Sequence, residues 1–444
     1  MNILFLHPNF PAQFRHLVAA LGKDPSHTVV FGTARQDGQI PGVHKVRYAP
    51  VRQIGTKTHP YVRSLENATL VGQATYRMAQ QLKAQGFYPD MIVGHSGWGP
   101  TLFMKDVFPK AQLICYFEWF YHAHGSDADF DPTAPLSLDD ELAIRLKNTP
   151  ILTDLYSCDR GLSPTHWQKQ QFPTEFHSKI SVLHDGIDSQ LFKPNPGAKL
   201  ILPSQGLDLS DVPEIVTYVA RGMEPYRGFP QFIEAAALLQ ANRPHCHIVV
   251  VGEDRVAYGS RRSDGKTYKD WMIETTPLDL SRIHFTGLLP YLEYRQVLQA
   301  SSVHVYLTRP FVLSWSLMEA LSVGCAVVAS DTAPVREVIQ HEENGVLVDF
   351  FSPAEIAERV EELLDRHWFK QELSVNARQT IVENYNLAKL LPQHIQWLLG
   401  DRTHPLTVVP ERVSKGFGSP SRQRPSTKTK RHSNSKLPKL PLRV

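Results

Sequence analysis

Short apolar runs alternate with amphipathic segments of helical length through most of the chain. Residues 3–6 (Ile-Leu-Phe-Leu) are typical of a buried parallel strand, and a polar loop then leads into an amphipathic segment at 14–21. The same pattern predicts further strands at 28–31, 91–94, 113–116 and 180–183. Ser137, followed three residues later by Asp140, resembles a capping box and predicts a helix that begins there.

The alternation restarts in the second half of the chain. Apolar runs predict strands at 215–220, 247–251, 283–286, 303–307, 326–329 and 345–348. Helices are expected between them, at 229–241, 316–323, 335–339 and 353–364. Strands that are separated by helical segments of this length are typical of βαβ units, which build parallel sheets.

A proline-rich segment separates the two series. Residues 193–213 contain four prolines and two glycines, a composition that suits a linker between domains. We therefore expect an α/β protein with two doubly wound, Rossmann-like domains, at 1–195 and 212–385. In such sheets ligands bind where the carboxyl ends of the strands meet, so two such domains would face a common cleft. Dehydrogenases, epimerases and glycosyltransferases all use this architecture, which does not choose among them.

The positive charge of the chain is concentrated at one end. Of the 47 lysines and arginines, ten lie in 412–444, which contains no acidic residue, so that 37 basic residues stand against 44 acidic ones in the rest. The same end is rich in serine and proline and poor in aliphatic residues, and we expect a disordered basic tail. Such a tail predicts weak contact with an anionic membrane, whereas the acidic body offers no basic face for nucleic acid.

The spacing of the cysteines and the length of the hydrophobic runs indicate the cellular compartment of the protein. The four cysteines (Cys115, Cys158, Cys246 and Cys325) lie far apart without a CxxC pair, which excludes a disulfide-rich scaffold and gives no zinc-ribbon pattern. The first residues lack the features of a signal peptide, and no run reaches the roughly 18 apolar residues of a membrane span. The expectation is a cytoplasmic protein with reduced thiols, at most peripheral on the inner face of the membrane.

The loops after the first strand of each domain argue against a dinucleotide-binding dehydrogenase. That class needs Gly-x-Gly-x-x-Gly there, because the backbone must approach the pyrophosphate closely. The first domain instead has HPNFP at 7–11, and the second has ARGMEPYRG at 220–228. In the second loop Arg221 ends the strand and Arg227 precedes a helix. Two guanidinium groups in this arrangement predict an anion site that suits a diphosphate.

The strand expected at 303–307 leads into a second candidate site. Residues 308–331 read TRPFVLSWSLMEALSVGCAVVASD, and the helix within them is expected to carry Glu319 in its first turn, on a face toward the cleft. The helix dipole favours a carboxylate there, which can accept paired hydrogen bonds from a ribose diol. An acid that only stabilises the helix is the alternative.

Together these segments resemble the C-terminal half of retaining glycosyltransferase family 4, which has the two-domain GT-B fold. Arg221 and Arg227 resemble the family's Arg…Lys diphosphate clamp, with Arg in place of Lys and one extra residue between them. Residues 324–331 (GCAVVASD) also keep the family's pattern.

The family's Glu-x7-Glu signature is only half present. Glu319 matches its second acid, but the first acid would fall at Phe311. In the family the first acid contacts the donor sugar. The resemblance therefore implies that donor recognition differs here, or that backbone amides near Leu313, Ser314 and Trp315 supply it.

The N-terminal half resembles the family more loosely. Residues 90–95 (DMIVGH) are similar to the family's strand that ends in a histidine facing the donor sugar. His95 is therefore the catalytic candidate of this half, and the nearby Gly94, Gly97 and Gly99 suggest a close approach of backbone to a ligand. A purely structural histidine is the alternative.

Two further segments carry the resemblance. Residues 184–188 (HDGID) look like the family's Asn-Gly-x-Asp, and we interpret them as a turn that is more architectural than catalytic. Residues 386–400 are similar to the helix that crosses back onto the N-terminal domain in this fold.

The resemblance implies a hexosyltransferase that moves a sugar from a nucleoside-diphosphate sugar to a hydroxyl of a saccharide or lipid-linked acceptor. It further implies retention of configuration and a place in cell-envelope polysaccharide or glycolipid synthesis. Arg221 and Arg227 would stabilise the leaving diphosphate, so this interpretation requires neither a cofactor nor a metal. A nucleotide-sugar 2-epimerase of the same fold is one alternative. An inactive nucleotide-sugar-binding module, suggested by the missing first acid, is another. The sequence does not identify the base, the sugar or the acceptor.

Overall fold

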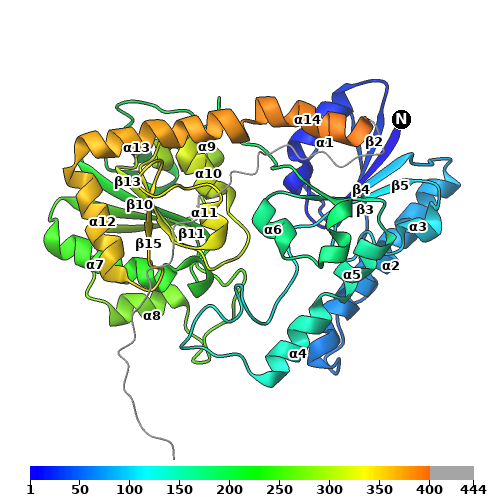
Figure 1. Ribbon diagram of the computed structural model, residues 1–444, viewed down its shortest axis with the longest axis horizontal. Coiled ribbons are helices and arrows are strands. Elements are labelled where there is room, and N and C mark those ends of the chain that lie inside the picture. Colours follow the sequence, from blue (N-terminus) through cyan, green and yellow to red (C-terminus); the bar gives the residue numbers. More distant parts are fainter. Residues whose placement is uncertain (401–444) are drawn as a thin grey trace, which may run out of the picture. The chain divides into compact units, whose positions relative to one another are not determined.

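Two α/β domains, each built on a parallel sheet, make up the part of the chain that the structure describes (Figure 1). The computed structural model describes residues 1–400, and the basic tail expected at 412–444 lies outside the described residues. Every strand pair within the two large sheets is parallel. The expected fold class, with two Rossmann-like domains, is confirmed.

The first domain contains a seven-stranded sheet in the order β3-β2-β1-β4-β5-β6-β7. Its strands are β1 (Asn2–Leu6), β2 (Thr28–Thr33), β3 (Val43–Arg47), β4 (Met91–His95), β5 (Gln112–Tyr116), β6 (Arg160–Ser163) and β7 (Ile180–Val182). The predicted strands lie within two residues of the observed ones, but the hydrophobic pattern missed β3 and β6. β3 is a half-exposed edge strand that contains three polar residues, and β6 is short and contains a glycine.

Alternate residues of the central strand β1 explain its continuous apolar run. Leu4 and Leu6 pack in one hydrophobic cluster, whereas Ile3 and Phe5 pack in another on the opposite face. Both faces of the strand are therefore buried, as expected for a sheet covered by helices on two sides.

Helices and short helical turns connect the strands of the first domain. They are η1 (Ala12–Phe14), α1 (Arg15–Lys23), η2 (Pro60–Val62), α2 (Arg63–Ala84), α3 (Met104–Val107), α4 (Leu138–Lys147), α5 (Thr149–Ser157), α6 (His166–Gln170) and η3 (Thr174–Lys179). The capping box predicted for α4 is confirmed. The Ser137 hydroxyl accepts from the Asp140 backbone N–H at 3.2 Å, and the Asp140 carboxylate accepts from the Ser137 N–H at 3.0 Å.

The second domain contains a six-stranded sheet in the order β12-β11-β10-β13-β14-β15. Its strands are β10 (Glu214–Gly222), β11 (Cys246–Glu253), β12 (Ile283–Gly287), β13 (Val303–Tyr306), β14 (Val327–Ser330) and β15 (Val346–Val348). Its helices are η5 (Pro225–Arg227), α7 (Phe229–Asn242), α8 (Tyr268–Thr275), α9 (Tyr291–Ala300), α10 (Trp315–Ser322), α11 (Ala333–Arg336), α12 (Pro353–Asp365) and α13 (His367–Thr380). All six predicted strands are present within two residues.

The segment between the domains has some structure of its own. It forms a small antiparallel pair, β8 (Ile201–Leu202) and β9 (Leu207–Asp208), joined by η4 (Pro203–Gln205). It is therefore a compact connection rather than a plain loop.

A helix from the end of the described chain packs on the first domain. After α13 and the turn η6 (Ile381–Tyr385), α14 (Leu387–Leu399) follows, and both helices are drawn in orange in Figure 1. Trp397 and Leu398 of α14 belong to the hydrophobic cluster that contains Ile3 and Phe5. The Trp397 indole also donates to the Ser181 hydroxyl at 3.1 Å. No helix within residues 1–400 is long and apolar enough to cross a bilayer, and the four cysteines are buried free thiols.

Candidate active site

Neighbouring strand ends in the first domain bring a histidine and a carboxylate together. His95 ends β4, and Glu118 lies two residues after β5, whose Tyr116 pairs with His95. The Nε2 atom of His95 lies 3.5 Å from Oε2 of Glu118, and its Nδ1 atom lies 2.8 Å from the Ser96 carbonyl oxygen. The predicted catalytic candidate thus lies beside an acid that the sequence did not single out.

The electrostatics of this pair favour an ionised carboxylate. His95 is buried, whereas the Glu118 side chain is 31% exposed. Loss of hydration raises the pKa of Glu118, but its interactions with His95 and with the Gln13 side chain lower it below its usual range. Burial, with His95 nearby, lowers the pKa of His7 to about 3, so the His7 ring is neutral at pH 7.

The glycines around His95 serve the packing of their own loop. A Cβ atom at Gly99, where φ is +101°, would lie 2.0 Å from the carbonyl oxygen of Ala68 in α2. A Cβ atom at Gly94 would lie 2.3 Å from Cγ2 of Thr101. Contacts within the chain therefore require glycine at 94 and 99, and the expected close approach of backbone to a ligand stays a prediction.

Gly99→Ala is expected to destabilise the protein by about 2 kcal/mol or more, since it adds a steric clash to an unfavourable backbone conformation. Gly125→Ala is the matched control, because Gly125 has φ +79° but nothing within 4 Å of the added Cβ atom. Thermal denaturation should show a clearly larger loss for Gly99→Ala. Equal losses would mean that the contact between this loop and α2 is not tight.

Asp185 connects the two domains. Its carboxylate accepts a hydrogen bond from the Tyr116 hydroxyl at 3.0 Å and one from the indole N–H of Trp315 in α10 at 3.2 Å. Burial raises the pKa of Asp185 to about 7, although both hydrogen bonds favour the charged form. The turn at 184–188, expected to be mainly architectural, therefore also places an acid where the domains meet.

Glu319 is buried where α10 packs against α9. Its carboxylate accepts hydrogen bonds from the hydroxyls of Tyr294 at 2.6 Å and Tyr291 at 3.1 Å. Burial raises the pKa of Glu319, and the two hydroxyls and the charge of Arg15 oppose this shift. The carboxylate is therefore held in a fixed orientation by its own domain.

The position of Glu319 in its helix needs a correction. The Ser314 hydroxyl accepts from the Ser316 backbone N–H at 3.2 Å and caps α10, which begins at Trp315. Because the helix begins one residue earlier than predicted, Glu319 lies in the second turn rather than the first.

A cavity of about 50 Å³ lies between the domains at Glu319. Residues from both domains line it: Ala12, Gln13, Arg15, His16, Asp185, Gly186, Ile187, Asp188, Leu191, Phe192, Tyr291, Trp315 and Glu319. The Arg15 guanidinium lies 5.6 Å from the Trp315 ring and 5.9 Å from the Tyr291 ring. Its Nε atom is buried and has no hydrogen-bond partner among residues 1–400. The cavity thus brings a cation at the start of α1 near the Glu319 carboxylate.

The two arginines of the expected diphosphate clamp have different environments. Arg221 is the penultimate residue of β10 and is exposed, whereas Arg227 is buried. The Arg227 guanidinium donates to the Thr308 and Tyr306 hydroxyls, at 2.6 and 3.1 Å, and to the Val312 carbonyl at 3.0 Å. This corrects the expectation of an open site formed by both arginines, because Arg227 anchors the loop between β13 and α10.

The position of the family's first acid is filled by an aromatic cluster. Phe311 is 9% exposed, and its ring centroid lies 4.9 Å from that of Trp119, which belongs to the first domain. It lies 5.4 Å from the ring of Tyr226 and 5.3 Å from that of Tyr258. Phe311 therefore packs at the domain interface rather than in the interior of the second domain.

The loop residues Leu313, Ser314 and Trp315 are partly committed to internal contacts. The Ser314 backbone N–H donates to the Tyr306 hydroxyl at 2.9 Å, and the Trp315 indole N–H donates to Asp185. The amide of Ser314 is therefore not open to a donor sugar in this structure, which corrects that part of the expectation.

The loop between β5 and α4 adds contacts between the domains. The Tyr226 hydroxyl donates to Asp127, and the Arg309 guanidinium forms an ion pair with Asp131 at 3.1 Å. Phe130 of the same loop packs edgewise on Phe350, with ring centroids 5.2 Å apart. Side chains of the first domain thus reach the strand ends of the second.

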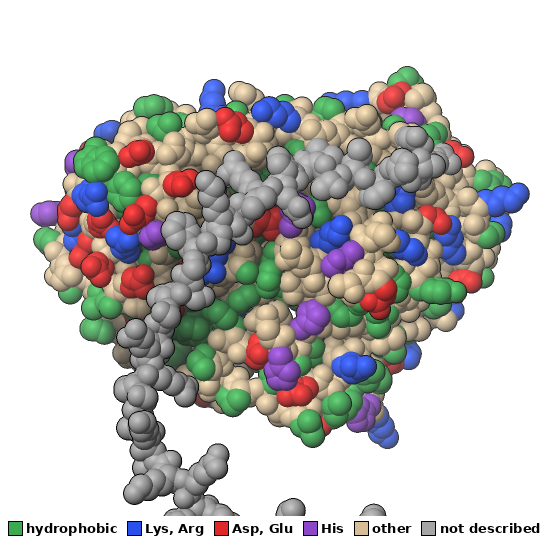
Figure 2. All heavy atoms as spheres, viewed as in Figure 1, with side chains coloured by type: hydrophobic (Ala, Val, Ile, Leu, Met, Phe, Trp, Pro, Cys, Tyr) green, Lys and Arg blue, Asp and Glu red, His purple; other side chains and the backbone are tan. Residues whose placement is uncertain are grey.

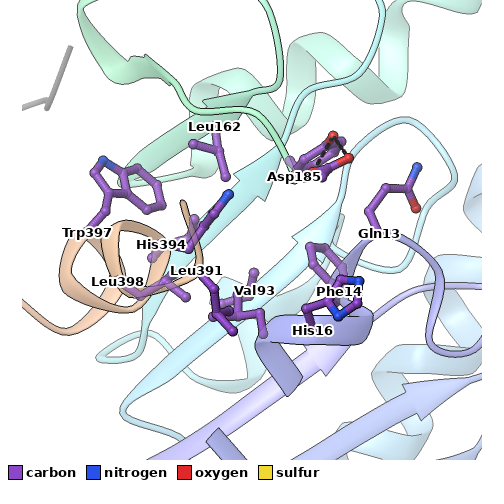
Figure 3. Close-up of a pocket in the computed structure, with 13 residues that line it drawn as sticks. Gln13, Phe14, His16, Val93, Leu162, Asp185, Leu391, His394, Trp397 and Leu398 are labelled. Carbon is purple, nitrogen blue, oxygen red and sulfur yellow. Dashed lines mark hydrogen bonds between the residues drawn. The ribbon is translucent and has the colours of Figure 1, made fainter. Parts of the chain in front are cut away.

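A second cavity, shown in Figure 3, lies beside the site and not within it. It has a volume of about 30 Å³, and α14 lines it with His394, Trp397 and Leu398 opposite Phe14 and His16. A single water needs about 10–15 Å³ of such volume. The cavity is therefore far too small for a nucleotide.

Metal ligands and surface charge add little to the site. Within residues 1–400, no group of three or more His, Cys, Asp or Glu side chains could hold a metal ion.

On the face shown in Figure 2, basic and acidic side chains are interspersed, so the described residues in that view form no continuous basic surface.

Sequence reasoning missed three residues of this site: Glu118, Asp185 and Arg15. Each lies just after a strand or opens the helix that follows one, where a parallel sheet presents its ligands. Their position after a predicted strand could have identified Glu118 and Asp185. Arg15 had a weaker signal, because the loop before it lacks the glycines typical of the family.

Two family descriptions match the chain. Residues 25–192 match the glycosyl transferase family 4 group, and residues 204–380 match the glycosyl transferases group 1. The chain is 27% identical over 221 residues to the alpha-D-kanosaminyltransferase of Streptomyces kanamyceticus, covering 50% of this chain and 53% of that protein. It is 24% identical over 242 residues to the alpha-maltose-1-phosphate synthase of Mycolicibacterium smegmatis, covering 51% and 58%. The chain thus spans little more than half the length of these relatives.

Solved structures share the fold over almost the whole described chain. HepE of Anabaena, in complex with UDP-glucose, has a TM-score of 0.63 at 16% identity, covering 90% of this chain and 99% of that one. The sucrose-phosphate synthase of Thermosynechococcus elongatus has a TM-score of 0.65 at 16% identity, covering 90% and 98%. At this level of identity the likeness establishes the two-domain fold alone.

Proposed function

The chain belongs to the group 1 glycosyltransferases of family 4, and from this premise we propose that it transfers a hexosyl group from a nucleoside-diphosphate sugar to an acceptor hydroxyl. One observation carries the proposal furthest. The cavity between the domains holds a fixed carboxylate, Glu319, opposite a cation at a helix N-terminus, Arg15. A nucleoside diphosphate has the complementary groups, a ribose diol and a diphosphate.

The two halves of the nucleotide would be bound by different chemistry. Glu319 would accept the hydrogen bonds of the ribose diol, because an ionised carboxylate is an acceptor with two oxygens. Arg15, at the start of α1, and the exposed Arg221 would bind the diphosphate, which the dipole of α1 also favours. At about 50 Å³ this cavity is also too small for a nucleotide as it stands, so donor binding would have to widen it by moving the domains that carry Arg15 and Glu319 apart.

The chemical step follows from the charge that develops in it. As the glycosidic bond breaks, the leaving diphosphate gains negative charge, and fixed cations stabilise that charge more in the transition state than in the ground state. Family membership supports transfer with retention of the anomeric configuration of the sugar. It also supports a saccharide or a lipid-linked molecule as the acceptor. In this proposal the arginines supply the positive charge without a cofactor, so activity should persist in EDTA.

A turnover assay tests the proposed function. The protein is incubated with UDP-glucose, GDP-mannose and ADP-glucose in turn, with and without a panel of saccharide acceptors, and release of the nucleoside diphosphate is measured. We expect release with one donor that depends on the acceptor. An altered sugar without acceptor would indicate the 2-epimerase, and binding without turnover would indicate an inactive binding module.

Glu319→Gln is expected to raise the donor KM about tenfold with a smaller change in kcat, because a ribose contact stabilises bound substrate and transition state alike. Glu274→Gln is the control, since Glu274 is an exposed carboxylate on α8 that is paired with Lys266. Steady-state kinetics with varied donor separates the two constants. Loss of kcat at saturating donor would instead place Glu319 in the chemistry and favour the 2-epimerase.

A further inference from the structure

The Nε2 atom of His95 is a buried polar atom without a hydrogen-bond partner. His95 is 2% exposed, and Nε2 forms no hydrogen bond with any residue that the structure describes. Its nearest acid, Glu118, lies 3.5 Å away, too long for a good hydrogen bond. Since buried polar groups are nearly always hydrogen-bonded, the environment of His95 is incomplete without a further group.

Glu118 is the solvent-accessible member of the His95–Glu118 pair. Its Oε1 atom accepts from the Gln13 side chain at 3.0 Å, and its backbone carbonyl accepts from the Gln168 side chain at 2.7 Å. The side chain is nevertheless 31% exposed. These contacts hold the residue in place and leave the carboxylate accessible to a hydroxyl-bearing ligand.

A contact at the domain interface connects the neighbour of Glu118 with Phe311, which stands where the family's Glu-x7-Glu signature has its first acid. The next residue, Trp119, packs edgewise on Phe311 with ring centroids 4.9 Å apart. The Phe311 ring lies among three aromatic rings, with the Arg227 guanidinium 6.0 Å from its centroid. The same interface thus places an aromatic ring at 311 and an acid at 118, beside the histidine.

Building on the proposed function, we propose that Glu118 binds the hydroxyls of the transferred hexose, together with His95. A carboxylate can accept hydrogen bonds from two neighbouring sugar hydroxyls, and Nε2 of His95 can bond to a third. Glu118 thereby supplies from the first domain a sugar contact that Phe311 cannot make from the second. It is a binding residue for the sugar and not for the nucleotide.

This assignment separates sugar affinity from nucleotide affinity. Calorimetry compares UDP with UDP-glucose, GDP with GDP-mannose and ADP with ADP-glucose on the whole chain. For the pair that the wild type binds, Glu118→Gln should weaken binding of the nucleotide sugar about 10- to 100-fold and leave binding of the free nucleotide unchanged. His95→Gln should act in the same direction.

The chain offers a closely matched control. Glu141 is 36% exposed, and its carboxylate lies 3.3 Å from Nε2 of His124, so Glu141→Gln makes the same change in another carboxylate–histidine pair. It should bind both ligands like the wild type, and an unchanged melting temperature of Glu118→Gln shows that the variant is folded.

Three other results would overturn the role of Glu118 or the proposed function. Wild-type affinity of Glu118→Gln for the nucleotide sugar would overturn the role of Glu118 while leaving the proposed function in place. Weaker binding of the free nucleotide as well would also overturn it, because the contact would then not be specific to the sugar. Absence of binding of all three pairs by the wild type would overturn the proposed function, and this assignment with it.

Discussion

Replacing Arg227 with alanine is expected to destabilise the protein by about 3–5 kcal/mol. The buried guanidinium satisfies three acceptors in the segment that leads to α10, namely Tyr306, Thr308 and Val312. Its loss removes one hydrogen bond from each of these groups, although Tyr306 still accepts from the Ser314 N–H and Thr308 still donates to the Arg309 carbonyl. The melting temperature should therefore fall by roughly 5 °C or more, and nucleotide binding should fall with it, because the loop that leads to Glu319 is no longer held.

Arg221→Ala is the matched comparison. Arg221 is exposed, so its replacement should change the stability by no more than about 0.5 kcal/mol while weakening binding of the nucleoside diphosphate. Thermal denaturation measures the stability of both variants, and calorimetry measures their affinity for the nucleoside diphosphate. Together they distinguish a residue that holds the loop, as expected for Arg227, from one that contacts the ligand, as expected for Arg221. An Arg227→Ala protein with wild-type stability and reduced affinity would restore the original two-arginine clamp.

Asp154→Asn is expected to stabilise the protein at neutral pH. The Asp154 side chain is completely buried, and Oδ2 accepts from the Ser96 hydroxyl at 2.8 Å and from the Gly97 N–H at 3.3 Å. Burial raises its pKa from 3.8 to about 6, although these hydrogen bonds oppose the shift. An asparagine keeps an acceptor at this position and removes the buried charge.

The raised pKa of Asp154 makes the stability of the folded protein decrease as the pH rises. Because the folded protein binds the proton of Asp154 more tightly than the unfolded chain, its contribution to stability is present below pH 3.8 and is lost as the pH rises through about 6. The gain from Asp154→Asn should therefore grow from near zero at pH 4 to about 3 kcal/mol at pH 7. Denaturation across this range measures it.

An exposed aspartate provides the control for the pH experiment. The Asp211 side chain is 97% exposed, so Asp211→Asn should show no comparable gain with pH. A gain that is the same at pH 4 and pH 7 would contradict the assignment, since it would not come from titration of Asp154.

The hydrophobic pattern predicted most strands of the two sheets, because buried parallel strands need continuous apolar runs. The run at 3–6 supplies both faces of β1, and the strands of the second domain have the same character. The pattern failed where burial is partial, as in β3, whose edge position tolerates His44, Lys45 and Arg47. It also missed the helix α2, which has mixed rather than strictly periodic burial.

The site could be predicted only where one segment carries it. His95 and Glu319 could be named as candidates from the sequence because strand ends and helix starts can be recognised locally. The Glu118–His95 pair and the Arg15–Glu319 cavity join segments that are distant in the sequence, so only the fold brings them together. For Arg227 the prediction failed in the opposite way. Its position in the motif was recognised, but its burial depends on the loop 308–312, which no local pattern reveals.

In the proposed complex a nucleoside-diphosphate sugar binds between the two domains, with its ribose at Glu319 and its hexose at His95 and Glu118. A crystal structure of the protein with the nucleotide sugar selected by the turnover assay tests it most directly. We expect density for the ribose within hydrogen-bond distance of Glu319, for the diphosphate at Arg15 and Arg221, and for the hexose at Glu118. A nucleotide bound elsewhere on the protein, or one whose ribose does not reach Glu319, would rule out this binding mode.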